Sequence, residues 1–87
     1  MKANTDTATD PLKWRTPVYV RIGRGMREPV EGPHRALLYL STRWPAERSR
    51  CHAHAKFACA AAIEQSGSPE RARDAFVAAV IEARIHA

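Results

Sequence analysis

The stretch from residue 49 to residue 67, SRCHAHAKFACAAAIEQSG, constrains the fold most strongly because alanine dominates it. Six of the ten residues from 53 to 62 are alanine. Alanine has the highest helix propensity, and its small side chain lets partner helices approach closely. Ser49 is suited to the N-cap, and Gly67 is suited to the left-handed residue that ends a helix. We therefore expect one alanine-rich helix between these two residues.

This helix carries apolar residues on two opposite sides when they are spaced at 100° per residue. Phe57, with Ala53 and Ala60, lies almost opposite the main apolar stripe. A helix that is covered on two sides is normally central, so we expect the second helix to be the central one. The main stripe consists of Cys51, Ala55, Ala58, Cys59 and Ala62.

A β-hairpin is predicted before the first helix. From Thr16 to Ile22, apolar and polar residues alternate with period two, which is typical of a half-buried strand. Gly23-Arg24-Gly25 breaks the strand, and the run from 26 to 30 returns as its antiparallel partner. Pro29 in this second run is tolerable only at a sheet edge or a strand end.

Two further helices flank the alanine-rich one. Gly32-Pro33 opens a helix over residues 33 to 43, which Pro45 ends. Ser68-Pro69 opens the third helix in the same way. The first helix buries Ala36, Leu37, Leu40 and Trp44, and the third buries Ala72, Ala75, Phe76, Ala79, Val80 and Ala83.

The predicted fold class is therefore α+β: an N-terminal two-stranded β-hairpin followed by three helices. With 87 residues and 45% apolar content, the chain has the size of one small globular domain. Residues 1 to 14 lack periodicity and are predicted to form a mobile tail, which leaves residues 15 to 87 as the domain. A domain this small buries little surface, which favours oligomerisation.

Several short motifs follow one another in a characteristic order: Pro17-Val18-Tyr19-Val20, Gly23 and Gly25, Ala36-Leu37 with Leu40, Trp44-Pro45, Ala55 with Cys59, and Ala72-Arg73 with Ala75-Phe76 and Ala79. Their order and spacing resemble the small bacterial family of domain of unknown function 982. The resemblance covers roughly residues 16 to 85 and implies a small bacterial, cytosolic protein. It implies no catalytic residue, because the family has no established activity. The connector from 46 to 51 departs from the family pattern, which has a glycine near the start of the central helix.

A cytoplasmic location is predicted, because the chain shows neither the apolar core of a signal peptide nor a run of about 18 apolar residues. Cys51 and Cys59 would lie roughly 12 Å apart along one helix, too far for a disulfide, so both are expected to be reduced thiols.

Metal binding and catalysis both have weak support in the sequence. Cys51, His52, His54 and Cys59 include the usual zinc ligands, but Cys51 and Cys59 cannot approach one ion on a straight helix. His54 and Glu64 lack a nucleophile nearby in the sequence. Gly23-Arg24-Gly25 lacks the following helix of a phosphate-binding loop. We therefore predict no enzyme, no cofactor and no metal.

The first half of the chain carries the basic character. Residues 13 to 50 contain nine Lys or Arg residues and three Glu residues, whereas residues 51 to 87 contain four basic and four acidic residues. Arg73, beside the stripe of the third helix, either bonds a carbonyl or carboxylate elsewhere in the domain or holds an anionic ligand. Candidate contacts to an anion or to nucleic acid are Arg21, Arg24, Arg27, Arg35 and Arg43.

A second apolar stripe in the third helix suggests self-association. Val77, Ile81 and Ile85 recur every four residues, opposite the main stripe. Phe57 is expected to join them in a two-fold symmetric dimer interface. The protein is thus predicted to be a non-enzymatic interaction module. It is expected to self-associate and to bind another protein, but not a membrane. The alternative is a nucleic-acid-binding protein that uses the basic hairpin and first helix.

Overall fold

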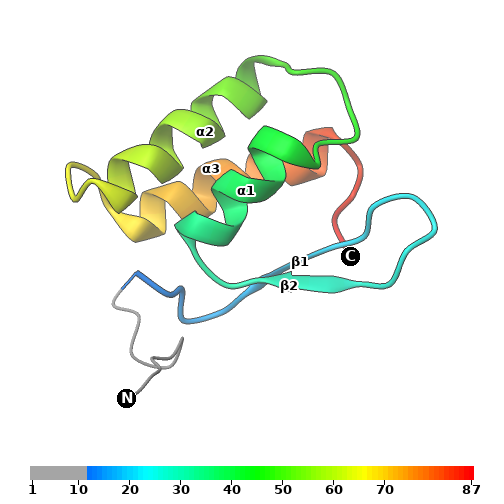
Figure 1. Ribbon diagram of the computed structural model, residues 1–87, viewed down its shortest axis with the longest axis horizontal. Helices are drawn as coiled ribbons and strands as arrows, with labels where there is room; N and C mark the ends of the chain where they lie inside the picture. The colour runs from blue at the N-terminus through cyan, green and yellow to red at the C-terminus, as the bar shows by residue number, and fades with distance from the viewer. Residues whose placement is uncertain (1–11) are drawn as a thin grey trace.

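The computed structural model describes residues 12 to 87 and confirms the α+β arrangement of one hairpin followed by three helices. The predicted tail, residues 1 to 14, lies mostly outside the described residues. The elements are β1 (Val18–Val20), β2 (Glu28–Val30), α1 (Pro33–Thr42), α2 (Arg50–Ile63) and α3 (Pro69–Glu82) (Figure 1).

The two strands pair antiparallel, with Val18 opposite Val30 and Val20 opposite Glu28. Val18, Val20 and Val30 are buried. Because side chains alternate along a strand, these residues and Glu28 share the face toward the helices. Tyr19 and Pro29, which oppose each other, share the outer face.

Residues 85 to 87 pair with the second edge of β1. The backbone N–H of Arg21 donates to the Ile85 carbonyl at 2.9 Å, and that of Ala87 donates to the Tyr19 carbonyl at 3.0 Å. The backbone groups of Tyr19 therefore point away from β2, and those of Pro29, opposite Tyr19, point to the other edge of β2. Pro29 thus has no N–H on that edge, as expected for an edge proline.

The three helices lie on one side of the hairpin (Figure 1). α1 and α3 are closer to the strands, and α2 packs against both of them on the side away from the hairpin. The side of α2 that carries Ala53 and Phe57 is exposed. α2 therefore contacts both other helices, but it is not covered on two opposite sides as its sequence suggested.

The helix starts follow the sequence closely. Ser49 accepts a hydrogen bond from the His52 N–H, and Ser68 accepts from the first two N–H groups that follow Pro69. The end of α2 differs: the left-handed residue is Gln65, with φ 64°, and not Gly67. A Cβ at Gly67 would lie 3.1 Å from the Ala61 Cβ, so glycine serves close packing there. Within the described residues, no helix combines the length and apolar character needed to cross a membrane.

Phe76 of α3 is the largest fully buried side chain. Its ring lies 6.0 Å from the Trp14 ring and 6.3 Å from the Trp44 ring, measured between centroids. The Trp14 indole N–H donates to the Pro69 carbonyl at 2.8 Å. Trp14, which the sequence placed at the end of the tail, is therefore a core residue that ties the N-terminal segment to α3.

Candidate functional site

An open groove of about 550 Å³ runs between α2 and α3, and we call it the α2–α3 groove. Small side chains dominate its lining because the alanines of α2 let α3 approach closely. Polar side chains of both charge signs also line it. The lining residues are His54, Phe57, Ala58, Ala61, Ser66, Gly67, Ser68, Arg71, Asp74, Ala75 and Ala78.

Phe57 is the one large apolar residue of this lining, and 74% of it is exposed. It lies one helical turn from His54 and from Ala61, which also line the groove. Full burial of a Phe side chain is worth about 1.5 to 3 kcal/mol relative to exposure. A projecting aromatic ring beside a hollow of alanines is therefore a favourable place for another molecule to dock.

The four residues predicted for the dimer interface differ in exposure and do not form one surface patch. Phe57 is exposed, and Ile81, one turn beyond Ala78 on α3, is 56% exposed. Val77 is half-buried against the core. Ile85 is only 7% exposed and belongs to the core, so its assignment to a surface patch is wrong. The reason is that α3 ends at Glu82 and the left-handed Arg84 turns the chain toward β1, which breaks the helical spacing.

The five candidate arginines do not form one surface. Arg21, Arg24 and Arg27 are exposed near the loop of the hairpin. Arg35 lies at the other end of the hairpin, where it lines a separate hollow with Lys13 and Pro29. Arg43 is held in an internal ion pair. Only the first three are therefore available to one ligand.

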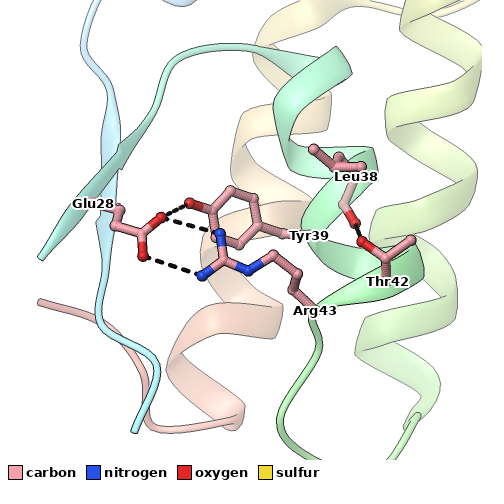
Figure 2. Close-up of polar contacts among 5 residues, drawn as sticks. All are labelled: Glu28, Leu38, Tyr39, Thr42 and Arg43. Atoms are coloured by element: carbon pink, nitrogen blue, oxygen red, sulfur yellow. Dashed lines mark hydrogen bonds and ion pairs between the residues drawn. The ribbon is translucent and has the colours of Figure 1, made fainter. Parts of the chain in front are cut away.

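Arg43 belongs to a network that joins α1 to β2 (Figure 2). Its guanidinium donates to both carboxylate oxygens of Glu28 at 3.1 Å and lies 4.6 Å from the centroid of the Tyr39 ring. The Tyr39 hydroxyl donates to Glu28 Oε1. The hydrogen bonds from Arg43 and, to a smaller extent, from Tyr39 lower the pKa of the Glu28 carboxyl. Burial and, to a smaller extent, the hydrogen bond to Glu28 raise the pKa of the Tyr39 hydroxyl. The network fixes the inner face of the hairpin against α1.

Acid is expected to weaken this network. Folding lowers the pKa of the Glu28 carboxyl from its ordinary value of 4.5. The ionised carboxylate therefore stabilises the protein fully at pH values above 4.5, and this contribution is lost as pH falls through the pKa of the folded state. As pH falls from about 6 to about 3, the Glu28→Gln variant should therefore lose less unfolding free energy than the native protein does. Denaturant titrations across this range measure the difference.

The matched control for this prediction is Glu64→Gln, because Glu64 is exposed and its carboxylate forms none of the ion pairs among the described residues. The control should keep the acid sensitivity of the native protein. Equal pH dependence in the native and Glu28→Gln proteins would contradict the assigned role of Glu28.

Arg73 serves a structural purpose. Its Nε donates to the Thr16 carbonyl at 2.8 Å, which attaches the segment before β1 to α3. This matches the first of the two roles that the sequence left open, a bond to a carbonyl elsewhere in the domain. Arg73 and Trp14 thus fasten the same segment to the same helix.

The histidines and cysteines of α2 do not converge. Among residues 12 to 87, no group of three or more His, Cys, Asp or Glu side chains is placed to hold a metal ion. His52 is buried, and its Nε2 lies 2.7 Å from the Leu40 carbonyl in the last turn of α1. Cys59 is buried, and burial raises the pKa of its thiol to about 12. His54 lines the α2–α3 groove, but Glu64 does not.

Two buried polar side chains were missed by the sequence reasoning. Tyr39 falls beside Leu40 and one turn after Ala36, so the helical period already placed it near the buried stripe. His52 lies one turn before Ala55, so the same period placed it near the buried stripe of α2. Both join the core because a carboxylate or a carbonyl on another element accepts their hydrogen bond.

The family resemblance is confirmed by a match of the family model over residues 16 to 87. The fold also matches the NMR structure of Agrobacterium tumefaciens protein Atu1219 with a TM-score of 0.75. The two chains are 31% identical, and the match covers 100% of this chain and 86% of the other. No curated protein matches. The chain therefore belongs to the family described as protein of unknown function (DUF982).

Proposed function

We propose that the protein is a non-enzymatic interaction module of the cytoplasm that forms a homodimer through the α2–α3 groove. The observation that carries the proposal is Phe57, which is 74% exposed beside a lining of alanines. Any other protein partner would compete for the same groove.

A second copy of the chain fits the groove because one surface contains complementary features. Phe57 projects, whereas Ala75 and Ala78 leave a hollow. In a two-fold symmetric interface, Phe57 of each copy rests on these two alanines of the other. Arg71 and Asp74 line the same groove with opposite charges, so each can face the opposite charge in the other copy.

Ile81 extends the apolar surface one turn beyond Ala78 and is itself 56% exposed. A domain of 87 residues buries only a limited fraction of its surface on folding. Burial of Phe57 and Ile81 in one interface would add to that apolar burial, which favours association over a monomer.

A non-enzymatic role is supported by the state of the nucleophilic side chains. The Ser66 hydroxyl donates to the Ala61 carbonyl, and the Ser68 hydroxyl caps α3. Burial keeps the Cys59 thiol protonated at neutral pH. Cys51 and Cys59 are both free thiols, which suits the reducing cytoplasm.

Phe57→Ser is expected to convert the native dimer to a monomer, because it removes the projecting ring and leaves the buried core unchanged. Ile81→Glu should weaken the dimer by placing a charge in the apolar surface. Sedimentation equilibrium over a range of micromolar concentrations gives the dissociation constants. The matched control is Leu38→Ser, which removes an exposed apolar side chain from α1.

The outcomes separate two levels of the proposal. A native protein that stays monomeric throughout the range contradicts self-association. A dimer that survives Phe57→Ser but not Leu38→Ser places the interface on α1 and contradicts the assignment to the groove. Equal melting temperatures of the native protein and the variants, compared at concentrations too low for dimerisation, would show that the substitutions act on the interface and not on the fold.

A further inference from the structure

The hairpin loop forms a second surface with a different character, and it uses none of the residues of the α2–α3 groove. From residue 21 to residue 27 the chain contains three arginines and no acidic residue. The next residue, Glu28, faces α1 and is held there by Arg43 and Tyr39. The positive charge at the loop is therefore not neutralised from within the hairpin.

Two of these cations, Arg21 and Arg27, lie at the two ends of the loop. If the strand register is continued by one residue, Arg21 lies opposite Arg27. Like charges at opposite positions destabilise a hairpin. The Arg27 guanidinium lies 4.3 Å from the centroid of the Tyr19 ring, which holds it on the outer face of the hairpin. An anionic group that lies between the two arginines would relieve their repulsion.

An apolar side chain stands among the arginines of the loop. Met26 is 84% exposed, more than any other large apolar residue in the described part of the chain. Gly23, with φ 61°, and the hydrogen bond from the Gly25 N–H to the Ile22 carbonyl shape the turn that presents it. The loop projects beyond the ends of the helices (Figure 1), so a large molecule can approach it without touching them.

We propose that this loop binds the backbone of double-stranded nucleic acid. Arg21, Arg24 and Arg27 contact the phosphates, and Met26 enters the minor groove as an apolar wedge. Proteins that bind the minor groove combine cationic side chains with such a wedge. Phosphate contacts by arginine give the affinity, and the wedge gives a preference for easily deformed A·T-rich steps.

The test is fluorescence anisotropy of a labelled, short A·T-rich duplex titrated with the full chain over a series of salt concentrations. The native protein should bind the duplex. The logarithm of its association constant should fall linearly with the logarithm of the salt concentration. Arg24→Ala should weaken binding and reduce the salt slope by about 1, because each phosphate contact releases about one counterion. Met26→Ser should weaken binding and leave the slope unchanged. The matched control is Arg35→Ala, an exposed arginine at the other end of the hairpin.

Three results would overturn the proposal. The first is no binding of the duplex at low salt. The second is an equal loss in Arg24→Ala and Arg35→Ala, which would show a diffuse attraction by net charge. The third is binding to phosphatidylserine vesicles without binding to the duplex, which would assign the loop to a membrane surface. Because Phe57→Ser leaves the loop unchanged, a monomeric variant should still bind one duplex, which separates this proposal from self-association.

Discussion

Phe76→Ala is expected to lower the free energy of unfolding by about 3 to 5 kcal/mol. The Phe76 ring is fully buried between Trp14 and Trp44, so its removal leaves a cavity bordered by two rigid indole rings. Small domains have total stabilities of about 5 to 15 kcal/mol, so this loss is a large part of the total. Urea denaturation followed by tryptophan fluorescence measures it, since both indoles adjoin the site.

Phe57→Ala is the matched control for this experiment, because it removes the same side chain from an exposed position. It should change the unfolding free energy little when the protein is dilute enough that dimerisation contributes nothing. Equal losses in the two variants would contradict the described core, because they would place both rings in comparable surroundings.

Ala62→Leu is expected to cost about 1 to 3 kcal/mol, because it inserts a branched side chain where α2 meets its neighbours. Ala62 is fully buried, and the close approach of the helices depends on its small size. Thermal and denaturant unfolding both report the loss. Ala53→Leu, on the exposed side of the same helix, should be nearly neutral. An unchanged stability of Ala62→Leu would mean that this stripe tolerates extra volume and is loosely packed.

The elements could be predicted from the sequence because local patterns determine them. Alternation around Val18 and Val20 indicated the strand, and a serine followed by proline placed the start of α3 at Ser68. The buried stripe of α3 follows directly from its helical period. Such signals depend on neighbours within a few residues, which a single sequence contains in full.

Features that depend on distant contacts could not be predicted in the same way. Ile85 has the correct spacing for an exposed stripe, but the helix ends before it and backbone pairing with Arg21 draws it into the core. Glu28 bonds Tyr39 and Arg43, and nothing near it in the sequence indicates these partners. In both cases the partner lies on another element, and the spacing along one element contains no information about it.

For the candidate site too, the features set by one helix were predictable and those set by contacts between helices were not. Phe57 was identified because it opposes the main stripe of its helix, and the structure leaves it exposed. The hollow beside it was not predictable, because Ala75 and Ala78 meet the alanines of α2 only after the two helices pack. For the arginines, the sequence reported their number but not that the fold divides them between two ends of the hairpin.

Pairing of residues 85 to 87 with β1 also affects the order in which the edges of this strand are protected during synthesis. β1 can pair with β2 as soon as the hairpin leaves the ribosome, since their contacts are local. Its second edge is covered only when the segment that contains Ile85 and Ala87 has folded back onto it. Neighbouring chains on one messenger RNA would meanwhile present the same open edge to each other, and exposed strand edges are sites of aggregation. Docking of residues 85 to 87 is thus the step that protects this edge of β1.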